Sequence, residues 1–95
     1  MRTIIQGAEM LTRESAHAEL ARALDFPEYY GANLDALWDL ASTTSADAEL
    51  ADGAVMLNHL GVYGCKLLQT LFEAAEENPD FHFRMKEILD EIEEV

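Results

Sequence analysis

The chain has 95 residues, of which 49% are hydrophobic and 26% charged, and this composition is typical of one small globular domain. Six Lys and Arg oppose nineteen Asp and Glu, so the formal net charge is −13. That charge disfavours direct binding to nucleic acid or to an anionic membrane, because both attract basic surfaces. We therefore expect a basic protein partner, although the excess of acid would also serve solubility alone.

Two further features of the sequence point to the cytoplasm. Cys65 is the only cysteine, so no intrachain disulfide can form, as expected in a reducing compartment. No stretch approaches the roughly 20 apolar residues of a membrane span, and the opening sequence MRTIIQG lacks the apolar core of a signal peptide. We expect a cytoplasmic protein.

The start of the chain predicts a strand followed by a helix. Arg2–Gln6 is a short β-branched run, which favours a strand. Thr12 is a suitable N-cap for a helix that Pro27 ends, because the residue before proline disfavours helical angles. His17 lies about 90° from the apolar stripe of this helix, so we expect a surface or packing residue there. The stripe consists of Ala16, Leu20, Ala23 and Leu24.

The next segment predicts a turn and a second helix. Gly31 permits backbone angles that other residues avoid, and Asn33 is a suitable N-cap for a helix over Leu34–Ala41. Asp35 and Asp39 are four residues apart and share one flank of that helix, between core and solvent. The predicted buried stripe is Leu34, Leu37, Trp38 and Ala41.

The second half predicts two more strands around a long helix. Ser42–Asp52 is polar and predicts a loop, whereas the apolar run Ala54–Leu57 predicts a buried parallel strand. A helix is expected over Gly64–Glu77, and the alternation in Phe81–Met85 predicts an edge strand. The expected inner face of the long helix is Leu68, Leu71, Phe72 and Ala75. The tail Lys86–Val95 predicts a short amphipathic helix that docks on this chain or mediates a weak homodimer.

The carboxylate pair Asp35 and Asp39 has two readings. Such a pair serves acid–base chemistry or metal binding in a hydrolase, but no nucleophile, activated histidine or further oxygen ligand can be placed beside it. The sequence has no glycine-rich phosphate loop, paired-cysteine zinc signature or nucleophile elbow. We therefore expect no enzyme, no metal site and no cofactor.

The other reading is a protein-binding surface. Tyr29, Tyr30 and Gly31 lie in a turn beside the carboxylates, where large exposed rings would anchor a partner and charges would steer it. The structural alternative is that one tyrosine caps the core and the other half-covers it. Trp38, in the predicted stripe, is expected mainly to pack in the core.

The segment PEYYGANLDALWD, residues 27–39, resembles the hallmark of the barstar family of intracellular inhibitors of secreted barnase-type ribonucleases. The resemblance is weaker over the first strand, Gly7 and the first helix. Beyond Ala41 the resemblance is limited to the order of helices and strands and to the helical segment Phe72-Glu73-Ala74, which is similar to the family's second contact region. It implies a single domain over residues 1–95, with an α/β fold in which a three-stranded parallel sheet packs against helices.

The same resemblance implies a function and a site. The function would be stoichiometric inhibition of a basic ribonuclease, extracellular or toxin-type, by lodging over its active site. Tyr29 would pack near the enzyme's catalytic histidine, Asp35 would meet basic groups, and Asp39 would enter the phosphate pocket as a substrate mimic. Glu73 would be the acid from the later helix. The remaining contact residues would be Tyr30, Gly31, Asn33, Leu34 and Trp38.

Some features depart from the family pattern. Residues 42–45, Ser-Thr-Thr-Ser, stand where the family often has an aromatic, and the short connection before Gly64 predicts that a small connecting helix is reduced. The tail Lys86–Val95 has no recognised family counterpart. Two alternatives stay open: an antidote or regulatory module for a different basic protein, and a metal-dependent hydrolase that uses Asp35 and Asp39.

Overall fold

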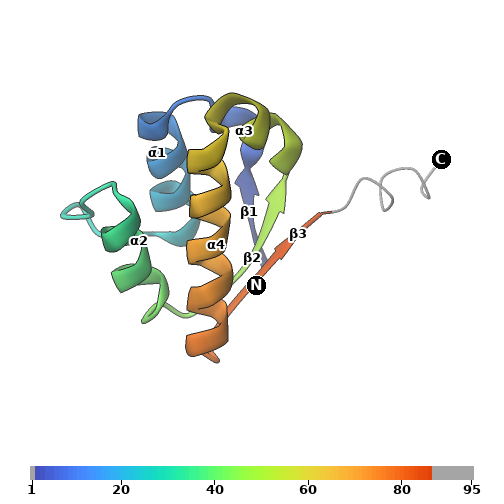
Figure 1. The fold of residues 1–95 in the computed structure, drawn as a ribbon. Helices are drawn as coiled ribbons and strands as arrows, with labels where there is room; N and C mark the ends of the chain where they lie inside the picture. Colours follow the sequence, from blue (N-terminus) through green and yellow to red (C-terminus); the bar gives the residue numbers. More distant parts are fainter. Residues whose placement is uncertain (1, 87–95) are drawn as a thin grey trace.

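The computed structural model describes residues 2–86, which form three parallel strands packed against helices (Figure 1). The strand order is β1-β2-β3, so β2 lies at the centre of the sheet. The α/β fold class predicted from the sequence is confirmed. In chain order the elements are β1 (Arg2–Gln6), the 3-10 turn η1 (Gly7–Glu9), α1 (Arg13–Leu24), α2 (Leu34–Ala41), β2 (Ala46–Ala51), α3 (Gly53–Leu60), α4 (Val62–Glu77) and β3 (Phe81–Met85).

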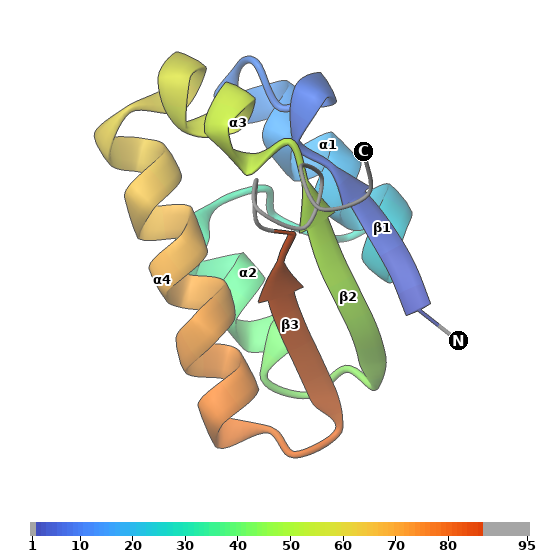
Figure 2. The same cartoon turned by 90° about the vertical axis from the view of Figure 1, so that its right-hand side faces the viewer.

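Within residues 2–86, the helices cover one face of the sheet and none of them covers the other, as Figure 2 shows with the strands toward the viewer. Alternate strand residues follow this division: Ile5, Leu50 and Phe83 point into the core, whereas Ile4 and Arg84 are exposed. The core between sheet and helices consists mainly of Ile5, Met10, Leu20, Leu37, Leu50, Met56, Leu67, Leu71 and Phe81.

The position predicted for the second strand is wrong. β2 (Ala46–Ala51) lies within the segment expected to be a loop, and the apolar run Ala54–Leu57 belongs to α3 instead. β2 tolerates the acidic Glu49, which is only 7% exposed, because Arg84 donates to its carboxylate at 2.8 Å and Arg2 lies 3.5 Å away. Because Ala54–Leu57 is helical, the connecting helix that was expected to be reduced is α3, a complete helix of eight residues.

The long helix α4 begins two residues before the predicted start, and its predicted inner face is correct in part: Leu71 is buried, and Leu68 and Ala75 pack against the core. Its buried residues are Gly64, Leu67, Leu71 and Ala74. Phe72, expected inside, is 41% exposed and its ring packs on the edge of Phe83 at a centroid distance of 4.9 Å. Gly64 lets α4 approach α3 closely, because a Cβ there would lie 2.9 Å from the Met56 sulfur.

The predicted C-terminal helix lies outside the described residues. Strand β3, by contrast, has the bounds predicted for it and pairs with β2 alone, as an edge strand does. Over residues 2–86, no helix is long and apolar enough to cross a membrane.

Candidate protein-binding surface

Helix α2 carries the two predicted carboxylates on a firmly started helix. Asn33 is its N-cap, and its side-chain oxygen accepts a hydrogen bond of 2.7 Å from the backbone N–H of Ala36. Asp35 lies in the first turn, where the helix dipole favours a negative charge. Both Asp35 and Asp39 are exposed, so their carboxylates are accessible to a partner.

The predicted apolar stripe of α2 is confirmed, with a gradient of burial across it. Leu37 and Ala41 are fully buried, whereas Leu34 and Trp38 are partly buried at the edge of the core. Trp38 therefore packs as predicted and still presents part of its surface beside Asp39 and Asp35.

The turn before α2 is held by backbone geometry rather than by an unusual glycine. The N–H of Tyr30 donates to the Pro27 carbonyl at 3.0 Å. Ala32, and not Gly31, has the left-handed backbone, with φ of 53°. Gly31 matters for close approach instead, because a Cβ there would lie 3.3 Å from the Ala36 Cβ. The expectation that Gly31 supplies the special angle is wrong.

The two adjacent tyrosines differ completely in their surroundings. Tyr29 is 81% exposed, so its ring is available to a partner. Tyr30 is partly buried; its ring packs on Phe26 at a centroid distance of 4.9 Å, and its hydroxyl oxygen lies 2.5 Å from Nδ1 of His17. Tyr30 thus fixes the turn to α1 while Tyr29 projects from it.

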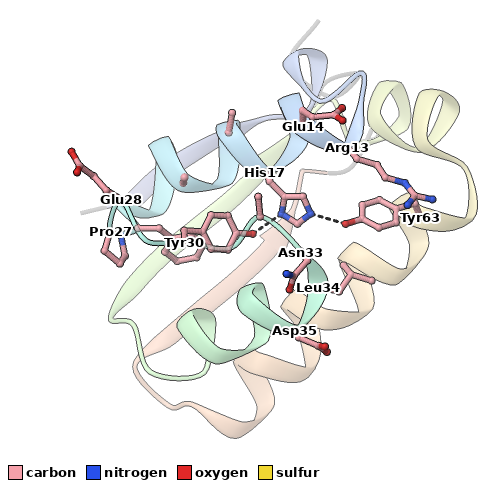
Figure 3. A pocket seen from close by; sticks show the side chains of 14 residues that line it. Arg13, Glu14, His17, Pro27, Glu28, Tyr30, Asn33, Leu34, Asp35 and Tyr63 are labelled. Carbon is pink, nitrogen blue, oxygen red and sulfur yellow. Dashed lines mark hydrogen bonds between the residues drawn. The ribbon is translucent and has the colours of Figure 1, made fainter.

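His17 joins three elements at this point (Figure 3). It is 2% exposed, and its second ring nitrogen, Nε2, lies 2.6 Å from the hydroxyl of Tyr63 on α4. Burial lowers the pKa of His17 and raises the pKa values of Tyr30 and Tyr63, so all three are neutral near pH 7. A neutral imidazole has one donor and one acceptor nitrogen, so one tyrosine accepts from the ring and the other donates to it.

Sequence reasoning missed the role of His17. Its packing position was anticipated, but its two hydroxyl partners come from the loop and from a helix 46 residues away. No pattern of local spacing signals such a contact.

Glu73 lies on α4, which packs directly against α2. Its side chain is exposed and accepts a hydrogen bond of 2.9 Å from Gln69. The views in Figures 1 and 2 both place α2 beside α4. The predicted contact residues therefore come from neighbouring elements on the helical side of the molecule. They are Tyr29, Tyr30, Gly31, Asn33, Leu34, Asp35, Trp38, Asp39 and Glu73.

The alternative of a metal-dependent hydrolase would require further metal ligands beside Asp35 and Asp39. In the described part of the chain, no three His, Cys, Asp or Glu side chains are grouped as a metal site requires. What the surface offers is exposed carboxylates and an exposed aromatic ring on rigid supports, which suit recognition of a basic protein.

Comparison with known proteins gives the family of the chain. The family described as Barstar (barnase inhibitor) matches residues 1–94. A protein of Bacillus subtilis (strain 168), named "Putative ribonuclease inhibitor YrdF", is 41% identical over 83 residues, which cover 81% of this chain and 88% of that protein. The chain therefore belongs to the barstar family, a family of ribonuclease inhibitors and not of enzymes.

Proposed function

We propose that this protein acts in the cytoplasm as a stoichiometric inhibitor of a basic, barnase-type ribonuclease. The observation that carries the proposal is the pair of exposed carboxylates, Asp35 and Asp39, on a capped helix beside the 81% exposed ring of Tyr29. A ribonuclease active site is cationic because it holds phosphate. Carboxylates on a rigid helix can occupy such a site without offering a bond to cleave.

In the proposed complex, the surface residues make different kinds of contact with the enzyme. Asp39 stands in for an RNA phosphate and accepts charge-assisted hydrogen bonds from cationic groups of the enzyme. Asp35 and Glu73 pair with basic residues around the active site, and Tyr29 packs on the enzyme as an aromatic anchor. The partly buried Trp38 and Leu34 supply apolar contact along the edge of α2.

In the experiment, this protein is titrated into a fixed amount of active barnase-type ribonuclease, and the rate of RNA cleavage is measured after each addition. We expect activity to fall linearly and to vanish at one equivalent. Cleavage that continues unchanged at excess inhibitor would overturn the ribonuclease assignment. A pull-down with a panel of other basic proteins would then test the regulatory-module alternative.

A further inference from the structure

A pocket of about 870 Å³ lies beside the proposed binding surface, between α1 and the segment from Phe26 to Asp35 (Figure 3). That volume lies within the range of sites that bind ligands or inserted side chains. One wall is α1, which contributes Glu14, His17 and Ala18, and the far wall includes Tyr63 of α4. The pocket shares Asp35 with the binding surface but extends it onto α1, which the family resemblance does not assign to any contact.

The charge of the pocket favours a cation. Its lining includes three carboxylates, Glu14, Glu28 and Asp35, and one cation, Arg13, so its formal charge is −2. Figure 3 shows Glu14, Glu28 and Asp35 on different sides of His17, with the Glu28 carboxylate pointing outward and His17 between the two tyrosines. The buried histidine and tyrosines are neutral near pH 7, for the reasons given above, so they do not offset this charge.

The aromatic lining favours a guanidinium in particular. The pocket already holds one such contact: the Arg13 guanidinium carbon lies 4.3 Å from the centre of the Tyr63 ring. The Phe26 and Tyr30 rings line the same pocket. A planar guanidinium stacks on aromatic faces and pairs with carboxylates through two hydrogen bonds, which an ammonium group cannot do.

We infer that this pocket receives an arginine side chain of the ribonuclease partner, as a second contact beside the one centred on Asp39. The inference rests on the proposed function and adds α1 to the interface. Continuity with the binding surface supports it, because Asp35 belongs both to that surface and to the lining of the pocket.

The test uses one variant that adds bulk to the pocket and one that removes a negative charge from it. Ala18 is an exposed residue of α1 that lines this pocket and also a smaller hollow beside Glu19, so Ala18→Trp is expected to narrow the pocket without replacing a core residue. We expect Ala18→Trp to raise the inhibition constant about tenfold. The matched control is Ala54→Trp, an equal change at an exposed position of α3 outside the pocket. Thermal melts of both variants confirm folding.

Two further measurements identify the occupant. Glu14→Gln should weaken inhibition more than Glu9→Gln, which removes the same charge outside the pocket. In addition, each arginine and each lysine of the ribonuclease is changed to alanine and tested against the wild-type inhibitor and against Ala18→Trp. One arginine should matter for the wild type and lose its effect against Ala18→Trp, because the filled pocket has already excluded it.

The outcomes separate the two proposals. If the wild-type protein fails to inhibit the ribonuclease, both the proposed function and this inference fall. If it inhibits and Asp39→Ala weakens that inhibition, but Ala18→Trp and Glu14→Gln match their controls, only the pocket inference is overturned. A lysine that alone shows the coupling to Ala18→Trp would also overturn the assignment of arginine.

Discussion

At the scale of single residues, Asp39 should be the acid on which inhibition depends most. It lies in the second turn of α2, at the centre of the proposed surface, with an exposed carboxylate. We expect Asp39→Ala to weaken inhibition more than Asp35→Ala or Glu73→Ala, with no loss of fold, since none of the three side chains is buried. Inhibition constants and far-UV circular dichroism of the three variants check this order. Equal inhibition by Asp39→Ala and wild type would contradict it.

The hydroxyl of Tyr63 matters for a different reason, because it pairs with a buried ring nitrogen. Tyr63→Phe keeps the aromatic ring but leaves Nε2 of His17 without this partner. We expect a loss of about 1–3 kcal/mol in the free energy of unfolding, the cost of a buried polar atom left unpaired. Urea denaturation measures it. Tyr29→Phe is the control, since its ring is 81% exposed and its loss of a hydroxyl should cost little.

At the scale of elements, the cap of α2 sets how well the carboxylates are presented. Asn33→Ala removes the bond to the Ala36 N–H and should cost about 1 kcal/mol of stability. Asn33→Asp retains an oxygen acceptor at the same place and should preserve most of that stability. Chemical denaturation of both variants tests the assignment. A loss of the same size in both would mean that the side chain acts through another contact.

Strand β1 and helix α1 are joined by a carboxylate whose ionisation is linked to folding. Glu19 accepts hydrogen bonds from Arg22 and from the backbone N–H of Gln6. The pKa of Glu19 lies below its ordinary value of 4.5, and the largest cause is the hydrogen bond from the Arg22 guanidinium. The folded state therefore binds fewer protons than the unfolded state, so this stabilisation is complete above about pH 4.5 and is lost as the pH falls through the lowered pKa.

The variant Glu19→Gln checks this linkage. Stability measured from pH 7 down to about pH 3 should fall less steeply for Glu19→Gln than for the wild type, because the titrating group is gone. Glu9→Gln, at an exposed position of η1, is the control for removing one carboxylate. The same slope in wild type and Glu19→Gln would remove Glu19 from the account of acid sensitivity.

Elements fixed by local interactions could be predicted from the sequence, and those fixed by distant partners could not. The cap at Asn33 and the period of Leu34–Ala41 act over three or four residues, so α2 was predicted with its exact bounds. Strand β2 depends on pairing at both edges and on an arginine 35 residues beyond Glu49 that compensates its charge. The role of His17 likewise requires Tyr63, which only the fold brings near. The family motif covers the turn and α2, so it predicts a site in the same part of the chain where local reasoning is strongest.

At the scale of the whole molecule, charge is distributed unevenly between two sides. Arg2 and Arg84 lie on the strands and pair there with Asp47 and Glu49. Between Arg22 and Lys66 the sequence has seven acids and no Lys or Arg, and five of these acids remain besides Asp47 and Glu49. Several of these acids, Asp35 and Asp39 among them, lie on the helical side that carries the proposed surface. A cationic enzyme would therefore be attracted to the binding side and oriented by the same field.

This distribution predicts a particular dependence on salt. The association rate with a basic ribonuclease should fall steeply as ionic strength rises from about 0.01 M to 0.15 M, because the screening length shortens from about 30 Å to about 8 Å over that range. The dissociation rate should change much less, since close contacts are screened weakly once water is excluded. Stopped-flow mixing at several salt concentrations separates the two rates. An association rate that is indifferent to salt would mean that the net charge of −13 serves solubility and takes no part in recognition.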